Sequence, residues 1–201
     1  MTQHTQEVGT ADISSAARTL AEGFADDPLL QWIFPDPATH LDYSVRYFTH
    51  QATAAAKHGQ LLADLDHVGA AAWLPSDQWQ RLEADAAHEA ALRAACGPHA
   101  ARAVTYDHAT AHRHPVDQPH WYLGYIGVQP AHRSHGVGSA LLRHVLDTCD
   151  REGLGAYLEA SSRRSARLYG RHGFELMGPG IQLPDGGPEM LPMWRNPAPR
   201  Q

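Results

Sequence analysis

The apolar positions of residues 136–152 repeat with the period of an α-helix. One face carries Leu141, Leu142, Val145, Leu146 and Cys149. The opposite face is charged, as expected of a helix that packs one side on a core. This segment is therefore predicted to be an amphipathic helix, and Cys149 is expected to be a buried, inert thiol.

Similar patterns divide the first part of the chain into alternating strands and helices. The expected elements are a short strand near Glu7–Thr10, a helix over 11–27, a helix over 38–58, and two strands over 60–65 and 67–75. Asp12 or Ser14 is the expected N-cap of the first helix, and Gly59 ends the second. A tight turn near Asp66 joins the two strands.

The second part of the chain continues the alternation. The expected elements are an alanine-rich helical region over 77–112 broken at 96–98, a strand over 120–128, the helix over 136–152, a strand over 156–161, a short helix over 163–172, and a closing hairpin of 174–178 with 190–195. This order predicts an α/β or α+β fold with one central sheet, in a single domain of residues 1–201.

Composition narrows the class of protein. The chain is 43% hydrophobic and 19% charged, which is typical of a soluble globular protein. No apolar run is long enough to cross a bilayer and the N-terminus lacks the apolar centre of a signal peptide, so we expect a cytoplasmic protein without a membrane partner. Two cysteines build no disulfide framework. A net charge of −6 argues against a nucleic-acid partner and leaves room for a cationic substrate.

Fifteen histidines are many for 201 residues. His108 and His112 would share a helix face, and the pair His112 and His114 has a spacing that could hold a metal. No cysteine, His-Glu-x-x-His motif or matching carboxylate accompanies them. We therefore expect exposed histidines and no metal site.

The segment between the strand 120–128 and the helix 136–152 carries the most chemistry. Arg133, Gly136 and Gly138 form an R-x-x-G-x-G pattern at the start of the helix. A helix that begins on glycines presents unpaired backbone N–H groups and the positive end of its dipole, which suits phosphate. A P-loop would need Gly-Lys-Ser/Thr, and a dinucleotide fingerprint would need a glycine where Leu141 stands. These residues therefore exclude both a P-loop and a dinucleotide-binding loop.

The same pattern, following the strand "YIGVQP", resembles the acetyl-CoA pyrophosphate loop of the GNAT superfamily of N-acetyltransferases. Downstream, "ARLYGRHGF" (166–174) resembles the superfamily's acceptor-side helix and turn. "GFADDP", "PHWYL" and "GGPEMLPMWRNP" further resemble the puromycin N-acetyltransferase branch, with a residue-by-residue likeness over about 119–195. Ser165 stands where that family has asparagine, and it retains a hydroxyl that can donate to the cofactor with shorter reach.

The resemblance implies a GNAT fold: a central mixed, mostly antiparallel sheet flanked by helices, with a helical insertion before the acetyl-CoA strand. It also implies a direct attack of a small-molecule amine, with antibiotics among the candidate acceptors, on acetyl-CoA in a ternary complex. The implied cofactor-binding residues are Ile126, Gly127, Val128, Arg133, Ser134, His135, Gly136, Val137, Gly138, Ser139, Ser165 and Tyr169. The Arg133 side chain would add charge at the pyrophosphate, and a backbone N–H within 126–128 would serve as the oxyanion donor.

For catalysis, Tyr169 matches the superfamily's tyrosine acid, which donates to the departing thiolate. The base stays open between His120, Glu159 and a water relay. His120, Tyr122 and Gly124 would share one strand face, and Tyr122 is an expected substrate contact.

Other residues have two readings each. Trp32 and Phe34 would line the acceptor pocket or pack in the core. The pair Asp26 and Asp27 would attract a cationic amine or form an ordinary helix end. Four arginines of one short helix would bind the cofactor 3′-phosphate or form a solvated face: Arg163, Arg164, Arg167 and Arg171.

Two other functions stay open: acetylation of a protein or peptide, and a non-catalytic module that binds acetyl-CoA. The helical region 77–112 is expected to cover the acceptor side, which favours a small molecule over a peptide. The protein is expected to be a monomer or a homodimer.

Overall fold

The computed structural model describes residues 5–9 and 12–199. Its strands follow the order β1-β2-β3-β4-β5-β8-β6, and β7 pairs with β8. Their bounds are β1 Thr5–Glu7, β2 Gln60–Asp64, β3 Gly69–Pro75, β4 His120–Val128, β5 Gly155–Ala160, β6 Glu175–Leu176, β7 Ile181–Gln182 and β8 Glu189–Arg195. Only the β4–β5 pair is parallel among the described strand pairs, so the expected mixed, mostly antiparallel sheet is confirmed.

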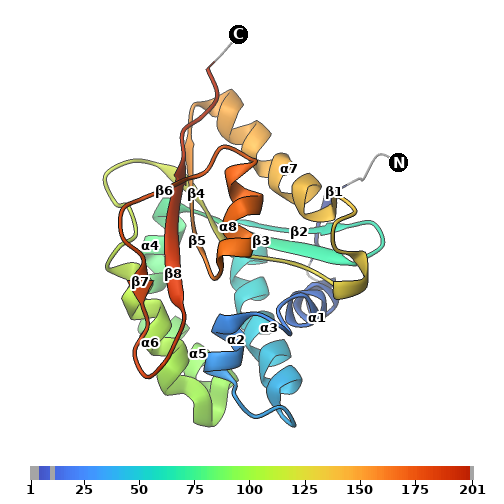
Figure 1. Cartoon of the computed structure of the whole chain (residues 1–201), viewed down its shortest axis with the longest axis vertical. Coiled ribbons are helices and arrows are strands. Elements are labelled where there is room, and N and C mark those ends of the chain that lie inside the picture. Colours follow the sequence, from blue (N-terminus) through green and yellow to red (C-terminus); the bar gives the residue numbers. More distant parts are fainter. Residues whose placement is uncertain (1–4, 10–11, 200–201) are drawn as a thin grey trace.

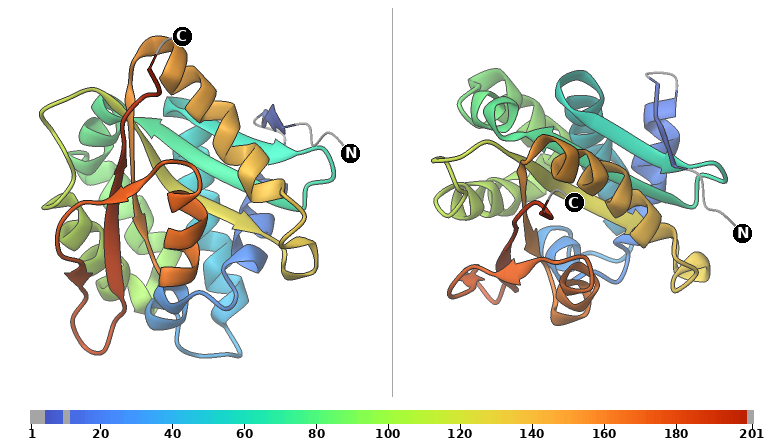
Figure 2. Two further views of the ribbon diagram at one scale, coloured as in Figure 1. Left: turned by 45° about the horizontal axis from the view of Figure 1, so that its top comes forward. Right: turned by 90° about the horizontal axis from the view of Figure 1, so that it is seen from above.

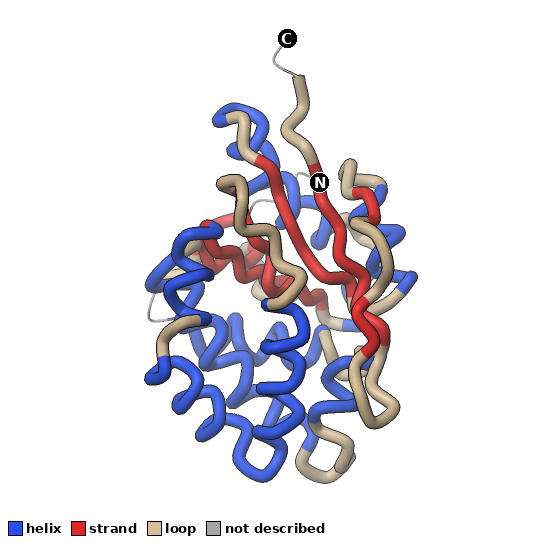
Figure 3. The backbone as a smooth tube through the Cα atoms, turned by 90° about the vertical axis from the view of Figure 1, so that its left-hand side faces the viewer, coloured by secondary structure: helices blue, strands red, loops and turns tan. Residues whose placement is uncertain are grey.

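Helices cover both faces of this sheet (Figures 1 and 2). They are α1 Ile13–Gly23, α2 Pro28–Ile33, α3 His40–His58, α4 Ser76–Glu83, α5 Ala86–Cys96, α6 Ala100–Ala111, α7 Val137–Glu152 and α8 Arg163–Gly170. The side view in Figure 3 shows most helices gathered below the strands. Among the described residues, no helix is both long and apolar enough to cross a membrane.

Two apolar clusters hold these layers together. One lies between α1, α2, α3, α5 and α6 and one face of the sheet, and the other lies between α7, α8 and the opposite face. The predicted apolar stripe of α7 is confirmed, because Leu141, Leu142 and Cys149 are fully buried and Val145 and Leu146 nearly so. Each such leucine contributes roughly 2 kcal/mol relative to an exposed position.

Strand β4 contains an irregularity that decides where its tyrosines point. Ala72 pairs with Tyr125 but Trp73 pairs with Leu123, so Gly124 is an extra residue on β4. The expectation that Gly124 shares a face with Tyr122 is confirmed, because both line one cavity and a Cβ on Gly124 would lie 3.7 Å from the Tyr122 ring. The bulge also brings Tyr125 to this side, where it lines the same cavity.

Strands β4 and β5 also separate partway along their length. Their parallel register runs from His120 and Gly155 to Tyr122 and Tyr157 and stops there, although both strands continue. Beyond this point β4 and β5 do not pair with each other. The residues concerned are Ile126–Val128 on β4 and Glu159 on β5.

Several predicted bounds need correction. The first strand spans Thr5–Glu7, whereas the sequence predicted a strand near 7–10. Thr10 lies outside the described residues. The helix predicted over 11–27 begins at Ile13, with Asp12 as its N-cap, and ends at Gly23. The helix does not continue to residue 27 because Asp27 and Pro28 start a separate helix, α2. The Asp27 side chain accepts from the Leu29 N–H, and Pro28 occupies the first turn of α2.

The remaining predicted elements agree more closely with the structure. The helical region is confirmed as α4, α5 and α6, broken at Gly97, whose φ of 54° suits glycine. Helix α3 ends before Gly59, as predicted. The closing pair is confirmed as β6 with β8, while β7 was not anticipated because it is only two residues long.

Candidate active site

A cleft opens where β4 and β5 separate. It is lined by the end of α1, by Ile126–Val128 of β4, by the loop and first turn at 132–139, and by residues 161–171 around α8. Every cofactor-binding residue expected from the sequence lines this cleft except His135. The two sequence motifs therefore meet in one place.

The start of α7 forms an anion-binding concavity at this cleft. Ser134 and Gly136 have φ values of 66° and 89°, which turn the backbone sharply ahead of the helix. The first helical bond here runs from the Ala140 N–H to the Gly136 carbonyl, so the N–H groups of Val137, Gly138 and Ser139 have no backbone acceptor within the described residues. These groups and the positive end of a 16-residue helix fit a phosphate group.

The Arg133 side chain makes contacts that the sequence did not predict, and its role at the pyrophosphate stays a prediction. Its two terminal nitrogens each lie 2.6 Å from a carboxylate oxygen of Asp26. It also donates to the carbonyl oxygens of Gly23 and Val128. The guanidinium therefore ties the glycine loop to the end of α1, and this ion pair holds the pKa of Asp26 below its usual value.

The end of α1 lies unusually close to β4 at this point. A Cβ atom on Gly23 would lie 2.8 Å from the Val128 backbone nitrogen. Any residue larger than glycine would push α1 away from the strand, because the neighbouring atoms are backbone. Gly23 therefore sets the width of the cleft on this side.

Helix α8 supplies positive charge to the opposite wall. Arg164, Arg167 and Arg171 line the cleft, whereas Arg163 does not. None of the three forms an ion pair with a carboxylate in the described part of the chain. Ser165 also lines the cleft, but its hydroxyl is used internally: it closes a capping box with Ser162 at the start of α8. The expected contact of this hydroxyl with the cofactor stays a prediction.

Two groups at the splayed strands can act on a thioester. Tyr169 lines the cleft, and burial raises the pKa of its phenol, so it stays protonated at neutral pH. The Gln129 N–H bonds to Val68 on the β3 side, so by strand alternation the Val128 N–H faces away from β3. That direction is toward the gap left by β5, as expected for an oxyanion donor.

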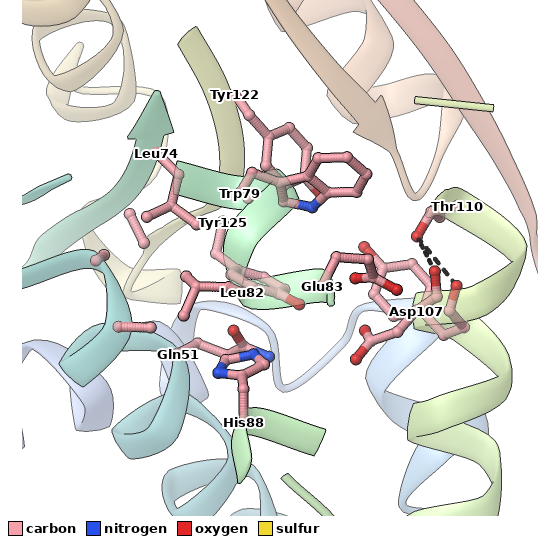
Figure 4. Close-up of a pocket in the computed structure, with 15 residues that line it drawn as sticks. Gln51, Leu74, Trp79, Leu82, Glu83, His88, Asp107, Thr110, Tyr122 and Tyr125 are labelled. Carbon is pink, nitrogen blue, oxygen red and sulfur yellow. Dashed lines mark hydrogen bonds between the residues drawn. The ribbon is translucent and has the colours of Figure 1, made fainter. Parts of the chain in front are cut away.

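A second cavity lies on the other face of the sheet, between β3, β4, α3, α4, α5 and α6 (Figure 4). Its volume is about 50 Å³. Trp79, Tyr106, Tyr122 and Tyr125 provide aromatic walls. Figure 4 shows Glu83 and Asp107 projecting into it from α4 and α6. Of these residues the sequence analysis had identified only Tyr122, because 77–112 carried no motif beyond its alanine-rich helical pattern.

Glu159 lies next to this cavity and is the better of the two predicted bases. The Tyr122 phenol donates to Glu159 Oε2 over 3.0 Å. Oε1 is buried and accepts no hydrogen bond from the described residues, although the Tyr157 phenol lies close by. Burial raises the pKa of Glu159 to about 7 from an ordinary value near 4.5. A carboxyl with this pKa suits a general base at neutral pH.

His120 is placed away from both the cleft and this cavity. Its Nδ1 pairs with the Gln118 carbonyl and its Nε2 lies 3.0 Å from Nε2 of His114. Burial lowers the pKa of both histidines, that of His114 to about 3. His114 is stacked on Trp79 and buried, not exposed as expected. In the part of the chain that the structure describes, no three metal-ligating side chains cluster.

Trp32 and Phe34 pack in the core and line neither pocket. Phe34 is 1% exposed and stacks on Tyr43, and Trp32 is 8% exposed beneath Arg102. The core-packing reading of both residues is therefore favoured. Asp27 caps α2 and accepts from Ser161, so it too serves the local structure.

Comparison with known proteins agrees with this geometry. Residues 27–174 match the model of the acetyltransferase (GNAT) family. The chain belongs to the acetyltransferase (GNAT) family. A segment of 58 residues, 29% of this chain and 24% of its relative, is 36% identical to an uncharacterized N-acetyltransferase of Schizosaccharomyces pombe. The matched segment thus covers about a quarter of that curated relative.

Solved structures of this family share the fold over the whole chain. A Corynebacterium glutamicum structure described as histone acetyltransferase HPA2 and related acetyltransferase is 28% identical, with a TM-score of 0.71 and coverage of 100% of this chain and 99% of that one. Arylalkylamine N-acetyltransferase 2 from Aedes aegypti is 11% identical with a TM-score of 0.64, over 98% and 99% of the two chains. A Drosophila melanogaster polyamine N-acetyltransferase is 18% identical with a TM-score of 0.59, over 97% and 100%.

Proposed function

We propose that this protein is an acetyl-CoA-dependent N-acetyltransferase that acetylates a primary amine of a small molecule. The observation that carries the proposal is the separation of β4 and β5, which leaves a gap toward which the Val128 N–H points, while Glu159 lies on β5 beyond the last paired residues and accepts from Tyr122. The anion-binding turn of α7 and Tyr169 border the same gap. Membership of the GNAT family supports the choice of acetyl-CoA, the acetyl donor used by GNAT acetyltransferases.

The residues present fit this cofactor. The N–H groups of Val137, Gly138 and Ser139 would hold the pyrophosphate, and Arg164, Arg167 and Arg171 would face its remaining phosphate. A Cβ on Gly138 would meet only ordinary contacts at 3.7 Å, so the fold itself does not require glycine there. The absence of a side chain is explained by a ligand that approaches the backbone closely.

Acetyl-CoA, when bound, supplies an acetyl group activated as a thioester. Glu159 would take a proton from the amine nitrogen, and Tyr122 would keep its carboxylate oriented. The Val128 N–H would stabilise the negative charge that develops on the carbonyl oxygen. Tyr169 would donate its phenolic proton to the departing sulfur.

Two features support a small acceptor. The cavity beside Glu159 is narrow and enclosed by α4, α5 and α6, whereas a peptide needs an open groove. Fold neighbours named as agmatine, polyamine and arylalkylamine N-acetyltransferases act on small amines. An antibiotic such as puromycin, suggested by the sequence resemblance, is a finer form of this proposal. Protein acetylation is the second candidate, favoured by the description of the Corynebacterium glutamicum neighbour as a histone acetyltransferase.

The test is release of the CoA thiol from acetyl-CoA in the presence of alkylamines, puromycin and lysine peptides. We expect turnover with small amines, and little with peptides. Turnover on peptides alone would overturn the small-molecule proposal. Binding of acetyl-CoA without turnover of any amine, unaffected by Tyr169→Phe, would identify a non-catalytic module instead.

A further inference from the structure

A polar contact joins the two sequence motifs beside the cofactor cleft. His172, in the turn after α8, places its Nε2 atom 3.0 Å from the hydroxyl oxygen of Ser139, in the first turn of α7. Both helices pack on the same face of the sheet (Figure 1). Ser139 lines the cleft, whereas His172 does not. The imidazole would therefore act on a molecule in the cleft through this hydroxyl.

The fold fixes the backbone of His172 at both of its polar groups. Its N–H donates to the Tyr169 carbonyl over 2.8 Å, and its carbonyl accepts from Nε of Arg195 on β8 over 2.9 Å. Arg195 is held in turn by the two carboxylate oxygens of Asp150 on α7, at 2.8 Å each. Residues of α7, α8 and β8 thus determine where His172 lies relative to Ser139.

The His172 ring is neutral at neutral pH. Burial lowers its pKa, and the cationic side chains of Arg143, Arg171 and Arg195 lower it further. A neutral imidazole carries one N–H, so Nε2 either accepts from the Ser139 hydroxyl or donates to it. The hydroxyl offers the cleft a donor hydrogen only if Nε2 donates.

The pyrophosphate proposed at this turn would select the arrangement in which Nε2 donates. Phosphate oxygens accept hydrogen bonds, and the Ser139 hydroxyl belongs to the same helix turn as the three N–H groups that would hold them. A hydroxyl that donates to an anion leaves only its lone pairs for the ring. Nε2 must then carry the hydrogen.

We propose that His172 is a positioning residue for cofactor binding, whose Nε2–H donates to Ser139 and thereby directs the Ser139 hydroxyl to a pyrophosphate oxygen of acetyl-CoA. This inference rests on the proposed function and adds a residue to its cofactor side. The turn after α8 then supports the phosphate site from outside the cleft.

Calorimetric titration with acetyl-CoA tests this link. Ser139→Ala and His172→Phe should each weaken binding by about tenfold, the scale of one hydrogen bond to a charged group. The double variant should bind no more weakly than either single variant, because both changes remove the same contact. His172→Gln places an amide N–H near the position of Nε2 and should retain most of the affinity.

His144→Phe is the matched control, since His144 is exposed on α7 and does not line the cleft. This variant should bind acetyl-CoA as tightly as the unmodified protein. NMR of isotope-labelled histidine nitrogens adds a readout that a merely structural role would not move. In the complex with acetyl-CoA, the His172 Nε2 signal, identified by its loss in His172→Gln, should be that of a protonated nitrogen.

Three results would overturn this inference while leaving acetyl-CoA binding in place. They are additive losses in the double variant, a His172→Gln variant as weak as His172→Phe, and an unprotonated Nε2 in the complex. The spectrum of the unmodified protein decides the question even if His172→Phe disturbs the fold. No binding of acetyl-CoA by the unmodified protein would overturn the proposed function and this inference together.

Discussion

At the scale of single residues, the proton on Glu159 controls the proposed chemistry. The carboxylate has lost most of its contact with water, the Tyr122 phenol donates a hydrogen bond to it, and the Tyr157 phenol lies close by. Its pKa of about 7 means that roughly half of the protein carries an ionised base at neutral pH. Its position beyond the last β4–β5 pair, not an unusual side chain, creates this property.

The pH dependence of acetyl transfer should report this group. Glu159 must be ionised to accept a proton, so we expect kcat/KM to rise about tenfold per pH unit below pH 7 and to level off above it. Glu159→Gln should lose most of the activity together with this limb. Steady-state rates between pH 5.5 and 9 would measure both. A limb that persists in Glu159→Gln would assign the base to another group or to a water relay.

At the scale of secondary-structure elements, the turn into α7 contains one glycine that the backbone conformation requires and one that it does not require. Gly136 has a φ of 89°, which other residues adopt at a cost of about 1–2 kcal/mol. Gly138 lies inside the first turn of the helix without a positive φ and with room for a methyl group. The two glycines therefore have different reasons to be present.

Alanine substitutions should reveal this difference. Gly136→Ala is expected to lower both the free energy of unfolding and the affinity for acetyl-CoA. Gly138→Ala should leave stability unchanged or raise it by up to about 1 kcal/mol, yet weaken acetyl-CoA binding by blocking the backbone N–H groups. Urea unfolding and calorimetric titration measure the two quantities. Full acetyl-CoA affinity in Gly138→Ala would remove the pyrophosphate from this turn.

The ion pair between Arg133 and Asp26 joins the end of α1 to the same turn. Substitutions at this pair can distinguish whether Arg133 positions the loop or contacts phosphate. If Arg133 only positions the loop, Asp26→Asn and Arg133→Ala should weaken acetyl-CoA binding to a similar degree, and the double variant should be no worse than either. Each should also lower stability by up to about 1 kcal/mol, because the pair is partly exposed. If Arg133 contacts phosphate, Asp26→Asn would leave binding intact or strengthen it, contrary to our expectation.

At the scale of the whole molecule, the partly buried histidines reduce stability in acid. Burial lowers the pKa of His50 to about 4 and of His114 to about 3, and it also lowers that of His88, His120 and His172. In the unfolded chain these groups titrate near 6.5. Each therefore contributes stability that is present above pH 6.5 and lost as the pH falls toward its folded value.

We therefore expect these histidines to lower the free energy of unfolding as the pH drops from 6.5 to 4, against the opposite contribution of carboxyls whose pKa is raised in the folded state, such as Glu159 and Asp107. Each histidine with a lowered pKa contributes about 1.4 kcal/mol per pH unit within its own window. His114→Phe keeps an aromatic ring against Trp79 and should flatten the dependence by one such group. Denaturant unfolding at pH 7, 5.5 and 4.5 measures the slope. An unchanged slope in His114→Phe would show that His114 is not held neutral in the folded state.

Local patterns in the sequence determined most of the elements and the cofactor side of the site. The apolar stripe of α7 and the glycine turn before it are set by residues within a few positions of one another. The same holds for "LYGRHGF", which carries Tyr169 and the turn after α8. For this reason two motifs were enough to predict the GNAT fold and the residues of the cleft.

Only the tertiary structure decided the acceptor side and the use of individual polar groups. Glu83 and Asp107 come from α4 and α6, and their approach to Tyr122 depends on helix packing and on the bulge at Gly124. Asp26 and Asp150 are 107 and 45 residues from the arginines that they bind, Arg133 and Arg195. Glycine turns and helix periods are short-range and visible in sequence, whereas burial, ion pairing and a shifted pKa arise when distant segments exclude water together.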